Sequence, residues 1–274
     1  MSTNVVKKEE AGLPAELMDD ILSTAGEGID FNASELEIPF IRVAQGTSPQ
    51  LKKSDAKHIA GLNQGDVFNT LTKEKWDGEK GIIVVPCYQA TVYPEFIPED
   101  QGGGYLGLID PSDPRLNQST RQGAKEFLAD GNEVIKTDQH YCLVVDEDGI
   151  FQKAIIDFKS TGLKVSRRWK TQIAMQKVKH PKTGEMETPA LFATMWKLSV
   201  VEESKTVDGS LRSWYNWSIE KVGFVQNKSL FNEAKKFRAS ITKGEVKAAS
   251  EDQPVQNAAP ADKDTLPKDD DIPF

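Results

Sequence analysis

Short runs of alternating apolar and polar residues, separated by turn residues, constrain the fold of this chain more than any other feature. The two clearest pairs are Tyr141–Val145 with Phe151–Phe158, and Ala190–Glu202 with Leu211–Val222. Asp146-Glu147-Asp148-Gly149 joins the first pair, and Asp208-Gly209 lies inside the second. An Asp-Gly pair between alternating runs is a strong signal for a β-hairpin. We therefore expect two antiparallel hairpins.

Other segments complete a β-rich pattern with inserted helices. Further strands are expected at Ile38–Ala44, Asp66–Leu71 and Gly81–Val92. Apolar residues at helical spacing predict helices over 14–23, 119–128, from Ser160 or Thr161 to about 178, and 229–241. Many short strands at hairpin spacing favour a small closed or partly open β-barrel. From the strands alone, an OB-fold, an SH3-like barrel and a mixed α+β sheet compete nearly equally.

The net charge of −8 is distributed unevenly. Residues 251–274 contain seven acidic and two basic side chains, which gives −5. Residues 151–180 contain eight Lys and Arg side chains against the single acid Asp157, which gives +7. A local basic excess of this kind indicates a phosphate-binding surface, whereas solvated helices usually mix both signs.

The cysteines and histidines indicate neither a disulfide nor a metal site. Cys87 and Cys142 both lie in β-type apolar runs, which is typical of reduced core residues in an intracellular protein. No pair of Cys or His residues has zinc-ligand spacing. No apolar run approaches the roughly 20 residues that span a bilayer, and the first ten residues lack a secretion signal. We expect a cytoplasmic chain without a cofactor.

Aromatic and basic residues together suggest a surface for single-stranded nucleic acid, which requires cations for phosphates and exposed rings for bases. Trp214 shares its strand face with the polar Asn216 and Ser218, and Trp76 lies at a turn, so these two rings are the best stacking candidates, with Tyr215 beside the first. Trp169, Trp196 and Trp217 are expected in the core. The candidate phosphate ligands are Lys153, Lys159, Lys164, Arg167, Arg168, Lys170 and Lys177.

The last six residues form an acidic run that ends in an aromatic residue, after a stretch rich in Ala, Pro, Asp and Lys that is typical of disordered linkers. Acidic side chains steer a peptide toward a basic surface, and a terminal ring and carboxylate can be captured there. The expected organisation is a flexible arm over 1–36, a DNA-binding body over 37–243, a linker over 244–268 and a partner-binding tip. The tip residues are Asp269, Asp270, Asp271, Ile272, Pro273 and Phe274.

Two parts of the chain resemble known families. The tip resembles the C-terminal end of bacterial single-stranded-DNA-binding proteins, which docks replication and repair enzymes. The segments 38–40, 45–53, 65–70 and 81–86 and the glycines at 102–104 resemble single-stranded-DNA-binding proteins of lytic tailed bacteriophages. The resemblance implies an OB-fold-like barrel that coats single-stranded DNA during phage replication and recombination, and a tip that recruits enzymes. It implies no catalysis, and it leaves open whether the chain forms a homo-oligomer.

Two other functions remain open at this point. Asp146, Asp157 and Lys159 match the D…(D/E)xK pattern of Mg²⁺-dependent nucleases, in which two carboxylates hold the metal and the lysine assists the attacking water. This hypothesis requires the two carboxylates to lie within reach of one metal ion. The remaining alternative is an adaptor that uses the tip without binding DNA.

Overall fold

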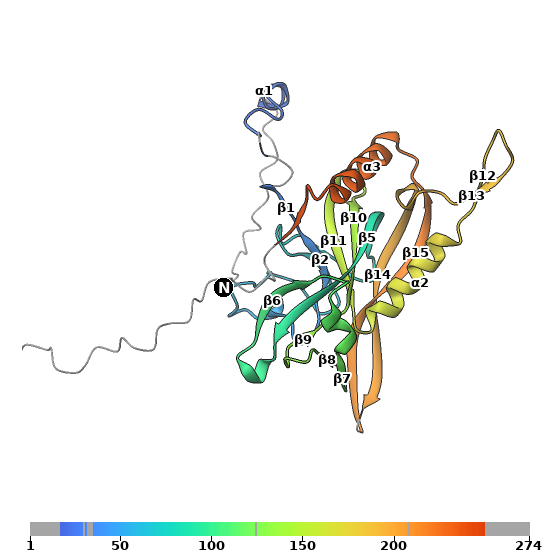
Figure 1. The fold of residues 1–274 in the computed structure, drawn as a ribbon. Coiled ribbons are helices and arrows are strands. Elements are labelled where there is room, and N and C mark those ends of the chain that lie inside the picture. Colours follow the sequence, from blue (N-terminus) through green and yellow to red (C-terminus); the bar gives the residue numbers. More distant parts are fainter. Residues whose placement is uncertain (1–16, 30, 32–34, 124, 208, 250–274) are drawn as a thin grey trace, which may run out of the picture.

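The computed structural model describes residues 17–29, 31, 35–123, 125–207 and 209–249. One large mixed β-sheet of twelve strands forms the centre of this part of the chain, and two helices, α2 and α3, pack against it (Figure 1). The strands of its central part are β2 (Phe40–Val43), β3 (Val67–Asn69), β4 (Lys75–Trp76), β5 (Ile82–Ile97), β10 (Thr137–Val145), β11 (Phe151–Lys159), β14 (Thr194–Val207) and β15 (Ser210–Phe224). The helices are α1 (Met18–Ser23), α2 (Gly162–Ala174) and α3 (Lys228–Thr242).

Smaller strands surround this central part. Between β5 and β10 the chain forms β6 (Gly104–Ile109), β7 (Thr120–Gln122), β8 (Lys125–Phe127) and β9 (Glu133–Val134). Two separate pairs are β1 (Glu37–Ile38) with β16 (Lys247–Ala248), and β12 (Val178–Lys179) with β13 (Met186–Glu187). We refer to residues 98–136 as the insert.

The strand β5 organises the sheet because different parts of it pair with different partners. Its first ten or so residues pair with β10 on one side, and Ile82–Val84 pair with β14 on the other. Its last residues pair with β6 and β9 of the insert. The central order is therefore β4-β3-β2-β11-β10-β5-β14-β15, in which only β2 and β11 run parallel.

Both predicted hairpins are present. The strands β10 and β11 pair antiparallel from Thr137↔Lys159 to Val145↔Phe151, around the predicted turn. The strands β14 and β15 pair from Thr194↔Phe224 to Val207↔Ser210 and form the longest hairpin, which extends beyond the other strands in Figure 1. The helices predicted near 160–178 and 229–241 correspond to α2 and α3.

The two faces of the sheet bury separate cores. On one face, the side chains of Trp169, Trp196 and Trp217 pack with Ile156 and Leu198, and α2 supplies Trp169. These three tryptophans are at most 6 % exposed, which confirms their predicted place in the core. On the other face, α3 packs its apolar stripe over the sheet; the stripe consists of Leu230, Ala234 and Phe237. We call the first the α2 face and the second the α3 face.

The helix predicted over 119–128 is wrong. This segment instead forms β7 and β8, which pair antiparallel with each other, while β8 also pairs with β9. Gly123 has φ +63° at the turn between them, a conformation that glycine adopts without strain. Leu128 is buried, but cross-strand pairing rather than a helix places it there. Pairing within a sheet therefore overrides the local helical spacing.

The ordered body extends beyond the predicted boundary at 243. The strand β16 pairs in parallel with β1, and Ala249 is 2 % exposed, so residues placed in the predicted linker pack against the body. Cys87 and Cys142 are buried and unbridged, as expected, and burial raises the pKa of the Cys87 thiol to about 12. Among the described residues, we find no helix with the length and apolar character required to cross a membrane.

Candidate nucleic-acid interface

A groove of about 620 Å³ lies on the α3 face, between the central strands, the insert and the β1–β16 pair. Its walls are formed by residues of β1, β2, β5, β6, β10, β11 and β16. Its lining residues are Glu37, Phe40, Arg42, Val92, Pro94, Phe96, Tyr105, Leu108, Ile135, Thr137, Gln139, Tyr141, Asp157, Lys159, Val246, Ala248 and Ala249. We call it the β10–β11 groove.

Strand alternation explains which side chains reach the groove. In β10, Thr137, Gln139 and Tyr141 line the groove, whereas Asp138 and His140 contact α2 on the opposite face. Successive side chains of a strand point to opposite faces, so every second residue is available to a ligand. In β11, Asp157 and Lys159 lie on the groove side by the same rule.

Aromatic rings are concentrated in the groove. The rings of Phe96 and Tyr105 lie with centroids 5.4 Å apart on the insert side. Tyr141 lies on the floor, where its ring contacts Tyr88 edge-on at 5.8 Å. Burial, followed by the nearby Asp157 carboxylate, raises the pKa of Tyr141, so its hydroxyl stays protonated at neutral pH and can donate a hydrogen bond. Burial also raises the pKa of Tyr105.

Charges of both signs line the groove. The Arg42 guanidinium Nη2 lies 3.8 Å from Asp157 Oδ2, and its carbon lies 5.1 Å from the centroid of the Phe40 ring. Lys159 ends β11 and is exposed. The groove thus offers cations for phosphate groups and rings for stacking, together with polar groups on Gln139 and Asp157 that can contact base edges.

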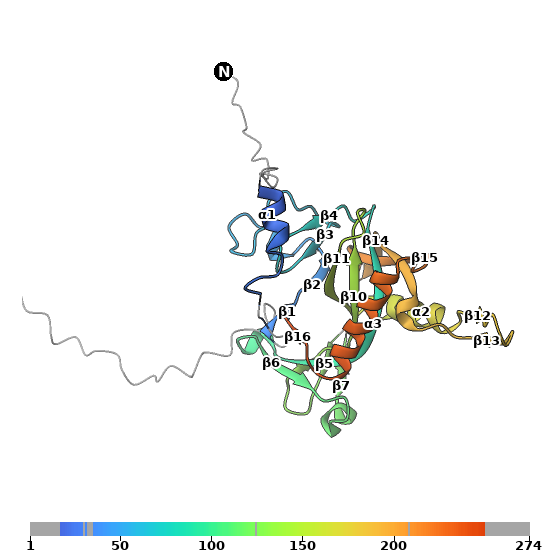
Figure 2. The ribbon, with the colours of Figure 1, turned by 90° about the horizontal axis from the view of Figure 1, so that it is seen from above.

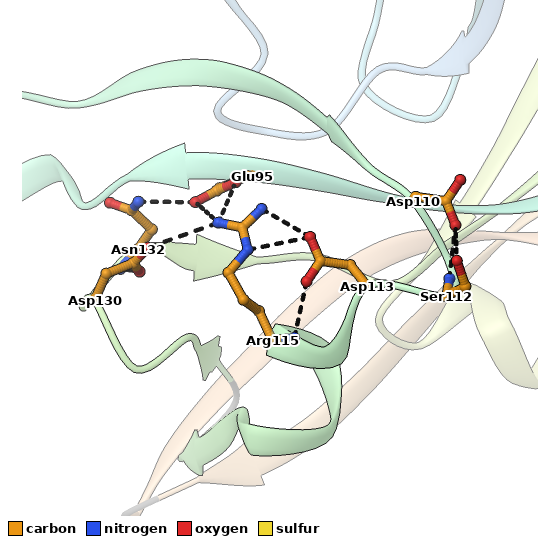
Figure 3. Close-up of polar contacts among 7 residues, drawn as sticks. All are labelled: Glu95, Asp110, Ser112, Asp113, Arg115, Asp130 and Asn132. Atoms are coloured by element: carbon orange, nitrogen blue, oxygen red, sulfur yellow. Dashed lines mark hydrogen bonds and ion pairs between the residues drawn. The ribbon is translucent and has the colours of Figure 1, made fainter.

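A network of polar contacts around Arg115 and the buried Glu95 fixes the insert that forms one wall (Figure 3). Arg115 Nη1 lies 3.2 Å from Glu95 Oε1, and its Nη2 lies 3.1 Å from Asp113 Oδ2. Asn132 Nδ2 donates to the same Glu95 oxygen at 2.8 Å, and Asp130 Oδ2 lies 3.7 Å from Arg115. Glu95 is only 7 % exposed, so these contacts compensate a buried carboxylate. Because Glu95 lies between the groove residues Pro94 and Phe96, the network holds that wall in place.

The structure separates the predicted phosphate ligands into two groups. Lys159 lines the groove, and Lys153 lies on the same face with its Nζ 5.4 Å from the centroid of the Phe237 ring. The remaining five lie on or after α2, which packs against the α2 face of the sheet; they are Lys164, Arg167, Arg168, Lys170 and Lys177. Lys170 Nζ is 2.7 Å from Asp138 Oδ2, and Lys177 Nζ donates to Thr188 Oγ1 at 2.7 Å.

The predicted stacking rings lie outside the groove. Trp76 packs against the α2-face core from β4. Trp214 Nε1 donates to Glu203 Oε2 at 3.0 Å across the β14–β15 hairpin. Tyr215 packs against the same core as Trp76, and its backbone contacts the side chain of Gln45.

Sequence reasoning did not single out the groove rings Phe40, Phe96, Tyr105 and Tyr141. Tyr141 could have been found, since it lies in a predicted strand. Strand alternation puts its side chain on the same face as that of Gln139 and on the other face from that of His140. Phe96 and Tyr105 carried no comparable signal, because the expected strand ended at residue 92. Their position depends on the extension of β5 into the insert and its pairing with β6.

The two carboxylates of the nuclease pattern lie at opposite ends of the β10–β11 hairpin. Asp146 is in the turn, where its Oδ1 accepts from the backbone of Asp148 and Ile150. Asp157 pairs with Gln139 of β10 and lies seven residues after Ile150, the last residue of the turn. At about 3.3 Å per residue this separates the carboxylates by roughly 20 Å, too far to share a metal ion. Within the described ranges, no cluster of three His, Cys, Asp or Glu residues could hold a metal.

Residues 269–274, the predicted partner-binding tip, lie outside the described residues. Comparison with known proteins gives one family. A family model described as "Pam3 phage gp34-like protein" matches residues 7–247. No curated protein and no solved structure matches the chain.

Proposed function

The chain belongs to the Pam3 phage gp34-like protein family, and for this phage protein we propose binding of single-stranded DNA, without strong sequence preference, in the β10–β11 groove. DNA would be coated stoichiometrically, without turnover, during phage replication, recombination or repair. The tip at 269–274 would recruit partner enzymes, as the resemblance to bacterial single-stranded-DNA-binding proteins implies.

The position of the groove within the strand order carries this proposal. Taken in chain order, β5, β10 and β11 form a meander, α2 follows, and the β14–β15 hairpin returns to the free side of β5. This order resembles that of an OB-fold, a partly open five-stranded barrel that binds oligonucleotides on its second and third strands and on the loops after its first and fourth strands. The corresponding second and third strands here are β10 and β11, the loop after the first is the insert, and all three line the groove.

The chemistry of the groove fits a flexible single strand better than a duplex. A base stacked on an aromatic ring contributes about 1–3 kcal/mol whatever its identity, because every base has a π-face. Phe96 and Tyr105 form a paired aromatic surface on the wall, and Arg42 and Lys159 line the same groove as candidate phosphate ligands. Bases in a duplex are stacked on each other and cannot use such rings.

The test is an anisotropy titration of a fluorescently labelled oligothymidine with the full chain in EDTA, at two salt concentrations. An external label is needed because none of the five tryptophans lines the groove. We expect Tyr105→Ala to weaken binding by about five- to 150-fold, the equivalent of one lost stacking contact. Lys159→Glu should weaken binding most at low salt, because it reverses a phosphate contact.

Two matched variants serve as controls. Phe224→Ala removes a partly exposed ring from β15, and Lys205→Glu reverses an exposed charge on β14; neither residue lines the groove. Both controls should bind like the parent chain. Unchanged binding by folded Tyr105→Ala and Lys159→Glu variants, established by thermal melting, would place the DNA elsewhere and overturn the proposal.

A further inference from the structure

Helix α2 presents a basic surface that the β10–β11 groove does not use. From Phe158 to Gly184 the chain contains eight Lys and Arg residues and not one Asp or Glu. Lys164, Arg167 and Arg168 stand at i, i+3 and i+4, so they share one stripe of the helix. Arg167 and Arg168 are exposed, and these three side chains form no ion pair with any residue in the described ranges.

The stripe is held on a rigid support. On the buried side of the helix, Ser166 and Trp169 are at most 1 % exposed. Ser166 Oγ donates to Asp138 Oδ2 at 2.8 Å, and Lys170 Nζ reaches the same oxygen at 2.7 Å. The helix is thus fixed to β10, and Asp138 neutralises Lys170 only. Like charges on one helical stripe repel each other, and a bound anion would relieve that repulsion.

The basic surface continues past the end of the helix. Lys179 and Lys182 are exposed in the β12–β13 hairpin, which projects from the body next to α2 (Figure 1). A row of cations along a helix and a projecting hairpin fits an extended polyanion better than a small anion, because the charges are spread over an extended surface rather than converging on one point. The basic surface has no exposed tryptophan or tyrosine within residues 159–184, so it suits the phosphate backbone of a nucleic acid rather than its bases.

This surface and the groove lie on opposite faces of the sheet. The groove borders β1, β16 and β6, which lie on one side of the central strands in both views, whereas α2 lies on the other side (Figures 1 and 2). In sequence the two sites meet only at Lys159, where β11 ends before α2 begins.

From this arrangement we propose that one chain holds two DNA strands at once, one in the groove and a second along α2, so that the protein bridges strands. The inference rests on the proposed function for the groove, while the α2 surface itself rests on charge and position. The second strand would be bound through its phosphates, and its bases would remain available for pairing.

The experiment measures how many oligothymidines of about 10 nucleotides, within the usual site size of an OB-fold, bind to one full-length chain. Native mass spectrometry at low ionic strength gives the stoichiometry directly and separates two oligonucleotides on one chain from a protein dimer. Donor- and acceptor-labelled oligothymidines give the second readout, since they cannot pair with each other and transfer energy only when held together.

We expect complexes of one chain with two oligonucleotides for the parent protein. The variant Arg167→Glu/Arg168→Glu should retain one oligonucleotide and lose energy transfer, with groove affinity changed by less than about threefold at physiological salt, where distant charges are screened. The control Lys235→Glu/Arg238→Glu makes the same change of net charge on exposed positions of α3 and should still bind two.

The possible failures can be told apart. Two oligonucleotides on the Arg167→Glu/Arg168→Glu variant, or one on the parent chain, would overturn the bridging proposal. If Tyr105→Ala/Lys159→Glu still binds two, the groove assignment fails. If it binds one, and energy transfer is lost, both assignments are supported.

Discussion

Gln45 completes the hydrogen bonding of an otherwise open strand. Its Nε2 donates to the carbonyl of Tyr215 at 2.8 Å, and its Oε1 accepts from the amide of the same residue at 3.0 Å. A side-chain amide thereby imitates a neighbouring strand. Because Gln45 follows β2, these two bonds link the β2 end of the sheet to β15 at its other end. Gly65 makes room for the contact, since a Cβ there would lie 2.9 Å from the Tyr215 ring.

We predict that Gln45→Ala lowers the free energy of unfolding by about 1–3 kcal/mol, because two hydrogen bonds are lost and a partly buried backbone pair is left without its partner. Urea denaturation followed by circular dichroism measures the loss. Gln45→Glu keeps the acceptor but places a carboxylate against the Tyr215 carbonyl, so it should be at least as destabilising. Parent-like stability of both variants would show that the link does not contribute to folding.

His140 connects the same sheet to α2, and the hydrogen bonds define its tautomer. Ser166 Oγ donates to Asp138, so His140 Nε2, 2.8 Å from that oxygen, must donate to Ser166. The ring therefore carries a proton on Nε2, and it stacks on Trp169 at 4.6 Å. Burial lowers the pKa of His140 to about 3, so the ring is neutral at neutral pH. Burial opposes ionisation of Asp138 as well, but hydrogen bonds from Lys170, Ser166 and Thr91 hold its pKa below the usual value.

This arrangement predicts a loss of stability on mild acidification. Between pH 6.5 and pH 3 the unfolded chain protonates His140 and the folded chain does not, so stability is full above the unfolded pKa and falls below it. With an unfolded pKa of about 6.5, the loss at pH 5 is about 2 kcal/mol. His140→Gln removes this contribution and should flatten the dependence between pH 7 and pH 5, as measured by urea midpoints. An equally steep dependence in the variant would contradict the assignment, because Asp138 titrates only at lower pH.

At the scale of elements, the sequence predicted the hairpins and helices whose residues carry a local pattern. The β10–β11 and β14–β15 hairpins were predictable from their turns, and α2 and α3 from their apolar stripes. The strands of the insert were not predictable from the sequence, because β7, β8 and β9 form by pairing with each other. An ion pair between Lys125 Nζ of β8 and Glu133 Oε2 of β9, at 2.7 Å, adds to this pairing. Such contacts join residues whose spacing carries no periodic signal.

The candidate site was predicted only in part, for the same reason. Lys159 and the basic character of α2 are visible as a local excess of charge. The separation of Lys159 from Arg167 onto opposite faces is not visible, because it depends on the packing of α2 against the face of the sheet opposite the groove. Tyr105 reaches the groove only through the pairing of β5 with β6. A site assembled from distant strands leaves little trace in any one of them.

At the scale of the whole molecule, the chain combines a net charge of −8 with a strongly basic helix. Residues 251–274 account for −5 of that net charge, and the three negative charges of Asp269, Asp270 and Asp271 are part of it. Charges of opposite sign on one chain attract each other at low ionic strength, so we expect the acidic tip to compete with DNA for the basic surfaces.

We therefore predict that deleting residues 269–274 strengthens oligothymidine binding at low salt. The advantage should disappear toward 1 M salt, where the Debye length is about 3 Å and distant charges no longer interact. Replacing the three aspartates by asparagine tests charge alone and should reproduce most of the gain in affinity. Phe274→Ala keeps these charges and should bind oligothymidine with the affinity of the parent chain. Anisotropy titrations of the four proteins over a salt series provide the measurement. Equal affinity of the deleted and parent chains at low salt would exclude competition between the tip and DNA, and the tip would then act only on partner proteins.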